Sequence, residues 1–384
     1  MGAGGQSGPS PSGTLWLPDG QRGQYWISVG VTDAAGRTDT VTVFLYAGPR
    51  QGPPTPPPVI PPNVPPPSGA PGRATVRQIG GLDRYQTSRM VSQAQWAAGH
   101  ADAVVLARGD AAPDALAGVP LAAKVHGPLL LTDPAALGRD DRAELDRVLG
   151  GPASHKTVYI LGGTAAVSPG IEAELRKAGY TVQRLSGETR FDTALAVAKR
   201  FGPTSHVIVA TGRNFPDALA AGPLGAVEGA PIVLSDDTTM DPATTAFVKT
   251  HTVIDAVGTQ AWNATKALAG PGRSVNPLYG ATRYDTATGV ARRVVAMSGH
   301  PFPAGVAIAG GTAFPDALTG GAFAANAGLP LLLTDPQRLD SATADQLHVW
   351  ANTLASVTIF GGRSAVTRPV ADAITRTVGG TALY

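Results

Sequence analysis

Short apolar runs alternate with alanine-rich stretches along most of the chain. Residues 104–107, 129–132 and 158–161 are rich in branched apolar side chains and are short enough to be buried strands. The stretches between them carry residue types that favour helices. Strands that alternate with helices predict βαβ units, in which helices cover both faces of a parallel sheet.

The first 47 residues follow a different pattern. Residues 25–46 alternate apolar and polar positions on either side of Asp33-Ala34-Ala35-Gly36, which predicts a β-hairpin with one buried face. The hairpin resembles the end of a bacterial immunoglobulin-like or polycystic-kidney-disease-type domain. Such a sandwich needs about 100 residues, so we expect residues 1–47 to be a partial immunoglobulin-like β segment.

A proline-rich segment follows at residues 48–72. It contains the runs Pro56-Pro57-Pro58 and Pro65-Pro66-Pro67, where backbone donors are scarce and the polyproline II conformation is favoured. We interpret the segment as a spacer and prefer this to a ligand for an SH3-type domain.

From residue 73 onward the sequence repeats itself three times. A ten-residue segment ending in Pro-Asp-Ala-Leu recurs without gaps at intervals of about 100 residues. Each copy follows a turn glycine and an Arg-aromatic pair, and each precedes an apolar strand that ends in glycine. The periodicity predicts three domain-sized repeats, which we call repeats 1, 2 and 3, at residues 73–183, 184–277 and 278–384.

The Pro-Asp-Ala-Leu segment predicts the start of a helix in each repeat. Proline at the first helical position loses no needed hydrogen bond, and the carboxylate after it meets the positive end of the helix dipole. The residues that form this structural motif are Pro113, Pro216 and Pro315, followed by Asp114, Asp217 and Asp316.

The signature has three parts: Gly-x-x-Arg-(Tyr/Phe)-x-Thr, then Ala-x-Gly-x-x-x-Pro-Asp-Ala-Leu, then an apolar strand ending in Gly-Gly. It resembles the cell wall binding repeat type 2 family over residues 73–384. The resemblance implies Toprim-like α/β repeats with parallel sheets, packed in tandem as a pseudo-threefold module. It also implies that the module anchors exported bacterial proteins non-covalently to anionic cell-wall polymers.

The same resemblance implies a partner, an assembly state and a location. The partner would be an anionic cell-wall polysaccharide or a teichoic-acid-like polymer, bound by a monomer outside the cell. The repeats nevertheless differ from one another at a few positions. Ala112 stands where the others have Phe215 and Phe314, Thr259 replaces the second turn glycine, and Ser88 replaces Ala194 and Ala287.

One arginine per repeat is the main candidate for ligand binding. Arg84, Arg190 and Arg283 each precede a predicted helix, where a cation opposes the helix dipole and so needs an anionic partner. The partner is either a phosphate or carboxylate of the ligand, held by the guanidinium as a fork, or the Asp of the motif. The second alternative makes the Arg and Asp residues architectural.

Two further sets of residues accompany the arginines. The aromatic neighbours would stack on sugar rings or pack in the core, and the glycines after the first strand would let a backbone approach the ligand closely. These residues are Tyr85, Phe191 and Tyr284, together with Gly109, Gly212 and Gly311.

Composition and charge exclude several classes of protein. A formal net charge of +2 argues against bulk nucleic-acid binding. The absence of Cys excludes a thiol nucleophile and a disulfide scaffold. No apolar run is long enough for a membrane span, and Met1 is not followed by a signal-peptide pattern, so we expect the true start of an exported protein to be missing.

The sequence lacks the motifs of common catalytic centres. It has no HExxH, Walker loop or Gly-x-Ser-x-Gly elbow, and we expect no metal and no cofactor. The interpretation is therefore a non-catalytic module that binds the cell wall. The alternatives are a sugar- or small-molecule-processing α/β enzyme that uses the strand-end Asp residues, and a purely structural surface-layer assembly protein.

Overall fold

The computed structural model describes residues 23–32, 38–47, 74–112 and 114–384, and it divides at residue 59 into two units. In the first unit, β1 (Gly23–Thr32) and β2 (Thr38–Ala47) pair antiparallel, with Val29 opposite Val41. The two strands of the predicted hairpin are thereby confirmed. The predicted turn and the proline-rich segment lie outside the described residues, and the immunoglobulin-like assignment stays a prediction.

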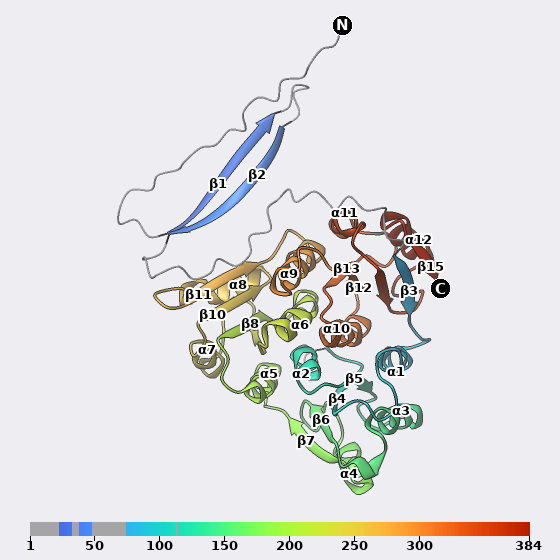
Figure 1. Ribbon diagram of the computed structural model, residues 1–384. Coiled ribbons are helices and arrows are strands. Elements are labelled where there is room, and N and C mark those ends of the chain that lie inside the picture. Colours follow the sequence, from blue (N-terminus) through green and yellow to red (C-terminus); the bar gives the residue numbers. More distant parts are fainter. Residues whose placement is uncertain (1–22, 33–37, 48–73, 113) are drawn as a thin grey trace. The chain divides into compact units, whose positions relative to one another are not determined.

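The second unit contains three parallel sheets, as the alternating pattern predicts (Figure 1). The first sheet, ordered β5-β4-β6-β7, comprises β4 (Ala103–Arg108), β5 (Leu129–Thr132), β6 (Thr157–Leu161) and β7 (Thr181–Leu185). The second, ordered β9-β8-β10-β11, comprises β8 (His206–Thr211), β9 (Ile232–Ser235), β10 (Val253–Val257) and β11 (Ser274–Leu278). The third, ordered β13-β12-β14-β3-β15, comprises β3 (Thr75–Ile79), β12 (Gly305–Gly310), β13 (Leu331–Thr334), β14 (Ser356–Phe360) and β15 (Thr381–Leu383).

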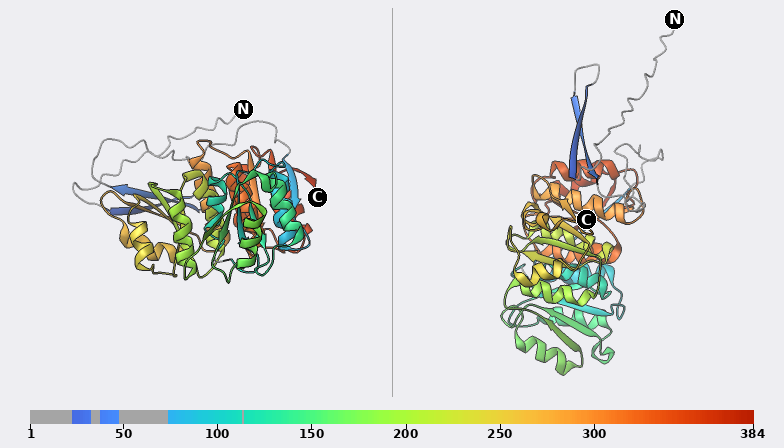
Figure 2. Two further views of the ribbon diagram at one scale, coloured as in Figure 1. Left: turned by 90° about the horizontal axis from the view of Figure 1, so that it is seen from below. Right: turned by 90° about the vertical axis from the view of Figure 1, so that its left-hand side faces the viewer.

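The third sheet is completed by a strand from the start of repeat 1. β3 pairs in parallel with β14, so that Val76 lies opposite Val357, and β15 pairs with the outer edge of β3. β7 and β11 hold the place of β3 in the other two sheets, and both strands run across the boundaries that the sequence pattern sets at residues 183/184 and 277/278. In Figures 1 and 2, the blue strand β3 accordingly lies among the red strands near the C-terminus.

Helices cover both faces of each sheet. Three central helices pack against one another, and they are α2 (Gly118–Lys124), α6 (Pro216–Glu228) and α10 (Pro315–Ala327). Beside them lie α1 (Arg84–Gln95), α5 (Arg190–Ala198) and α9 (Arg283–Met297). The outer faces carry α3 (Arg139–Leu149), α4 (Pro169–Ala178), α7 (Pro242–Val248), α8 (Thr259–Thr265), α11 (Ser341–Trp350) and α12 (Arg368–Thr377). Short 3₁₀ turns occupy residues 152–154, 199–201 and 266–268.

The strands are apolar on both faces because both faces are buried. Val105 and Ala107 of β4 point into a central core that contains residues of all three sheets. Val104 and Leu106, the alternate positions, point into a separate outer core under α3 and α4. One shared inner core and three outer cores therefore hold the second unit together.

The central helices meet at one repeat position. Val119 of α2 lies against Gly222 of α6, where an added Cβ would come within 2.3 Å of the valine side chain. Gly321 of α10 faces the same valine, with its added Cβ 3.7 Å away. One valine and two glycines therefore fill the space where three equivalent positions converge.

The predicted helix start is confirmed in repeats 2 and 3 and is wrong in repeat 1. α6 and α10 begin at their prolines, whereas α2 begins only at Gly118 and Asp114 lies in a turn before it. Pro113 itself lies outside the described residues. The rings of Phe215 and Phe314 contact each other edge to face at 5.9 Å, a contact that Ala112 cannot make. No helix in the described part of the chain is long and apolar enough to cross a membrane.

A buried acidic pair joins repeats 2 and 3. The carboxyl groups of Glu228 and Asp255 are fully buried, and Arg293 of α9 donates to Glu228 at 3.2 Å. Asn276 donates to Asp255 at 2.9 Å. Burial, followed by repulsion from Asp255, raises the pKa of Glu228 to about 9. The Glu228 carboxyl group therefore keeps its proton at neutral pH, beside Asp255 and opposite a single arginine.

We expect this pair to make stability depend on pH. The pKa of Glu228 rises from 4.5 to about 9 on folding, so between these values the unfolded chain has lost a proton that the folded chain keeps. Stability therefore falls as the pH rises through this range. The Glu228→Gln variant mimics the protonated form, so its melting temperature should exceed that of the unmodified protein by a few degrees at pH 8. The matched control is Glu188→Gln, which changes an exposed carboxylate. If the melting temperatures of the unmodified protein and both variants fall equally as the pH rises, the raised pKa of Glu228 is contradicted.

We also expect the three repeats to unfold as one unit. Because β3 belongs to the sheet of repeat 3 and the central core is shared, no repeat is complete alone. Calorimetry of residues 74–384 should show a single transition. An excised repeat should expose apolar surface and aggregate or self-associate. Three separable transitions, together with soluble monomeric repeats, would show independent domains instead.

Candidate functional site

The aspartates of the Pro-Asp motif lie at the boundaries between repeats. Each faces a threonine and an arginine of the next repeat, and repeat 3 faces repeat 1. The three sets are Asp114 with Thr193 and Arg190, Asp217 with Thr286 and Arg283, and Asp316 with Thr87 and Arg84. No ion pair within 4 Å joins these arginines to the aspartates among the described residues, so each arginine acts on the aspartate of the neighbouring repeat by longer-range attraction.

These aspartates are partly withdrawn from solvent. Burial raises the pKa of Asp217, while the Thr286 hydroxyl and the Arg283 guanidinium act in the opposite direction. Burial likewise raises the pKa of Asp316, while the Thr87 hydroxyl and the Arg84 guanidinium act to lower it. At Asp114 burial again dominates, and Arg108 adds to the attraction of Arg190. Each carboxyl group is thus held by contacts across a boundary.

The glycine that directly follows β6, β10 or β14 makes room for the aspartate in each repeat. Gly162, Gly258 and Gly361 have φ values of 93°, 91° and 108°, which side chains rarely adopt. A Cβ at these positions would lie 2.5, 2.4 and 2.6 Å from the Oδ2 atom of the facing aspartate. The sequence pattern locates these glycines after an apolar strand, but it does not reveal this structural requirement.

Each of the three arginines is anchored to a backbone carbonyl of its own repeat. The Nη1 atoms of Arg84, Arg190 and Arg283 donate to the carbonyl oxygens of Gly109, Gly212 and Gly311 at 2.6, 2.8 and 2.7 Å. One hydrogen bond uses only one of the five N–H groups of a guanidinium. Arg84 is exposed, whereas Arg190 and Arg283 are half-buried.

The three glycines serve the fold. Their N–H groups donate to Thr132, Ser235 and Thr334 at 2.9, 2.8 and 2.8 Å, so they are not free to bind a ligand. Tyr85, Phe191 and Tyr284 lie against the same glycines and pack on the central core. An added Cβ at Gly109 would lie 2.4 Å from the ring of Tyr85. The aromatic residues therefore have the core-packing role that sequence reasoning gave as one alternative.

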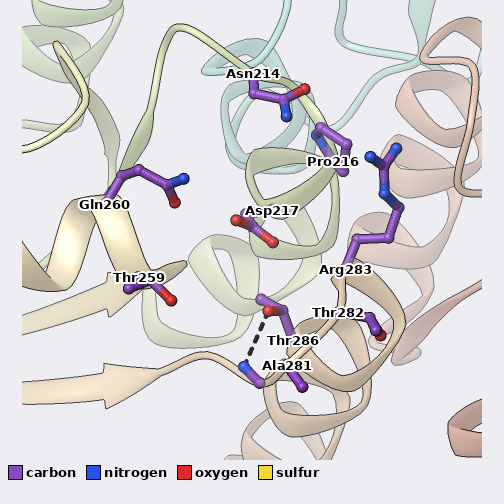
Figure 3. Close-up of a pocket in the computed structure, with 10 residues that line it drawn as sticks. Asn214, Pro216, Asp217, Thr259, Gln260, Ala281, Thr282, Arg283 and Thr286 are labelled. Carbon is purple, nitrogen blue, oxygen red and sulfur yellow. Dashed lines mark hydrogen bonds between the residues drawn. The ribbon is translucent and has the colours of Figure 1, made fainter.

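Clefts lie at the boundary between repeats 2 and 3 and at the boundary between repeats 3 and 1. The cleft between repeats 2 and 3, which we call the second cleft, has a volume of about 170 Å³ and is shown in Figure 3. Its lining includes Asn214, Asp217, Gln260, Thr282, Arg283 and Thr286. The cleft between repeats 3 and 1, the third cleft, has a volume of about 220 Å³ and includes Asp83, Arg84, Thr87, Thr312, Asp316 and Ser364.

Charge is balanced in the second cleft, whereas Asp83, Asp316 and a single arginine, Arg84, line the third. The second cleft combines one carboxylate with one guanidinium, and hydroxyl and amide groups supply the remaining polar atoms. Among the described residues, no group of three or more acidic or histidine side chains could hold a metal ion. The arrangement can form charge-assisted hydrogen bonds through the arginine and neutral hydrogen bonds through the other groups.

The fold and its boundary clefts define a binding module built from three tandem α/β repeats. The family model of cell wall binding domain 2 (CWB2) matches residues 78–172, 184–266 and 278–371. The chain belongs to this family, and it is a cell-wall-binding module. The three matched regions correspond to the three repeats that the sequence pattern indicates.

Two curated relatives from Bacillus subtilis (strain 168) are similar over most of the chain. The N-acetylmuramoyl-L-alanine amidase LytC is 27% identical over 320 residues, which are 81% of this chain and 60% of the relative. The amidase enhancer is 27% identical over 274 residues, which are 70% of this chain and 36% of the relative. The chain thus spans less than two thirds of either protein.

Two solved structures from Clostridium difficile share the fold. Cwp8 has a TM-score of 0.70 and 26% identity, covering 79% of this chain and 52% of Cwp8. Cwp6 has a TM-score of 0.69 and 21% identity, covering 80% of this chain and 48% of Cwp6. The likeness to Cwp6 supports the fold alone.

We expect adjacent turn glycines to differ sharply in their tolerance of alanine. Gly162→Ala places a Cβ against Asp114 at a strained φ, and it should lower the melting temperature by several degrees, for a cost of about 1 to 3 kcal/mol. Gly163→Ala is the control, because nothing lies within 4 Å of its Cβ position. Thermal unfolding measures both variants. Equal melting temperatures would show that the close approach of Asp114 is unimportant.

Proposed function

We propose that residues 74–384 hold an exported protein on the bacterial cell wall by binding a wall polymer non-covalently at the repeat boundaries. The observation that supports this most directly is the recurrence of one Arg-Asp-Thr set at each boundary. A polymer presents the same group at regular intervals, so a protein with several equivalent sites can engage several groups at once. The affinity rises because the sites are linked in one chain: once the first group of the polymer is bound, the later contacts form within the same complex.

The arginines favour a ligand that carries anions. After the bond to the glycine carbonyl, four N–H groups of each guanidinium remain for a phosphate or a carboxylate, which they can bind as a fork. The adjacent aspartate limits the net positive charge, so a dense polyanion is not favoured. We infer an anionic polysaccharide or teichoic-acid-like polymer in which charged groups are spaced by uncharged ones.

The neutral lining of the clefts fits the uncharged part of such a polymer. Thr282 and Gln260 in the second cleft, and Thr312 and Ser364 in the third, offer hydroxyl and amide groups to sugar hydroxyls. We place the module outside the cell as a monomer, with the pseudo-threefold arrangement within one chain. The activity that it anchors belongs to other parts of a longer protein.

The enzyme alternative depends on the strand-end aspartates. Each of these carboxyl groups is engaged by a threonine and an arginine across a boundary, and the same arrangement recurs three times. A catalytic centre needs one reactive arrangement, whereas an adhesive module gains from repetition. We therefore propose no catalytic function for these residues.

The direct test removes the arginine forks together. We expect the triple variant Arg84→Ala, Arg190→Ala, Arg283→Ala to bind purified cell walls at least about tenfold more weakly, because charge-assisted hydrogen bonds are lost. Co-sedimentation with walls measures the binding, and a melting temperature above the assay temperature verifies the fold.

Binding by the unmodified protein should also weaken as salt rises, since the Debye length falls from about 10 Å at 0.1 M to 3 Å at 1 M.

A matched triple variant controls for the loss of charge. Lys177, Lys249 and Lys266 lie at the carboxyl ends of α4, α7 and α8, at the opposite ends of the strands from the clefts. Replacing these lysines with alanine removes the same charge and should leave wall binding within about twofold. If both triple variants bind equally well, or if walls stripped of their secondary polymers retain the protein fully, the proposal is wrong.

A further inference from the structure

The boundary between repeats 2 and 3 carries larger, uncharged side chains than the other boundaries carry at the same positions. Counting from the strand ends, Tyr279 takes the place of Ser186 and Gly80, and Trp262 takes the place of Ala166 and Ala365. Both substitutions add an aromatic ring where the other repeats have a small residue. Their occurrence together at one boundary points to a local specialisation.

The two aromatic residues lie next to each other. The ring centroids of Trp262 and Tyr279 are 6.5 Å apart, with 38° between the ring planes. Trp262 is half-buried against the outer core of the second sheet, whereas Tyr279 is 44% exposed. The tryptophan thus supports a tyrosine that remains open to solvent. We call the pair the aromatic platform.

The residues of the platform are close in sequence to residues that line the second cleft. Tyr279 immediately precedes Gly280, and Trp262 follows Gln260 on α8, and both Gly280 and Gln260 line the cleft. The tryptophan reaches this place because Gly258 leads directly into α8 at Thr259. In repeats 1 and 3 a turn of several residues separates the strand from the next helix. Repeat 2 has Thr259 in place of the second glycine, and its helix accordingly begins directly after the strand-end glycine.

Two amide side chains complete the uncharged surface. Asn214 and Gln260 lie at the same side of the cleft, beyond Asp217, and neither is joined to another labelled residue by a hydrogen bond in Figure 3. Repeats 1 and 3 have Ala111 and Ala313 at the position of Asn214. An amide offers two donors and an acceptor, which suits a pair of neighbouring hydroxyl groups.

We propose that the second cleft and the aromatic platform form a subsite for an uncharged sugar ring of the wall polymer. The apolar face of the ring packs on Tyr279, and its hydroxyl groups bond to Asn214 and Gln260. Aromatic side chains supply apolar area with little loss of conformational freedom, and a few polar groups then fix the orientation of the ligand. The inference rests on the proposed function and assigns a different ligand group to one of the boundaries.

The test uses Tyr279→Ser, which introduces the residue that repeat 2 carries at this position, Ser186. The probe is the uncharged oligosaccharide fraction of hydrolysed walls, collected as the flow-through of an anion-exchange column. We expect this fraction to change the tryptophan fluorescence of the unmodified chain. Tyr279→Ser should bind about fivefold more weakly, and Asn214→Ala should also lose affinity. Tyr279→Phe keeps the ring and should stay within twofold.

A control and a second condition separate this inference from the proposed function. Val349→Ser removes another exposed apolar side chain, on α11, and should bind like the unmodified chain. At 1 M salt, where the arginine contacts are screened, residual sedimentation with intact walls should depend on Tyr279. Equal binding by Tyr279→Ser and the unmodified chain, or no binding of the uncharged fraction, would overturn the subsite while wall binding persists. Failure of the unmodified chain to bind walls would overturn both proposals.

Discussion

The pairing of β3 with β14 is the contact on which the rest of the module depends. A linear array of three repeats has two boundaries, whereas an array whose first strand enters the last sheet has three. The boundary at Asp316 and Arg84 exists only because β3 delivers α1 to repeat 3. Gln78 of β3 secures the closure by donating to the carbonyl oxygens of Gly361 and Val366 at 2.9 and 3.0 Å. The closing strand and the third cleft are therefore parts of one arrangement.

The residues of the repeated motif are required, first of all, by the packing at the repeat boundaries. The aspartate needs a glycine beside it because its carboxyl group occupies the space of a Cβ, as at Asp217 and Gly258. It also needs the threonine and the arginine of the next repeat, because a partly buried carboxyl group without partners is costly. Residues that are far apart in the sequence thus depend on one another. A ligand adds to a set of contacts that the fold already requires.

Much of the fold could be predicted from the sequence, because periodicity and repetition report local structure directly. The strands, the parallel sheets and two of three helix starts follow from residues within one repeat. The repeat that supplies the arginine facing each aspartate could not be predicted, because the motif offers Asp114 an arginine both in its own repeat and in the next one. The late start of α2 could not be predicted either, because Asp114 stands in the same Pro-Asp-Ala-Leu pattern that begins α6 and α10.

Departures from the repeat have two different physical causes. At the centre, equivalent positions of three helices meet, so three identical large side chains cannot fit, and Val119 packs against two glycines. Differences there are demanded by packing. The boundary clefts impose no such demand, because equivalent positions there lie apart, each at its own boundary. Helix packing therefore does not explain why Tyr279 differs from the residues at the same position in the other repeats. A difference of this kind, beside a cleft, can instead reflect the ligand that the cleft binds.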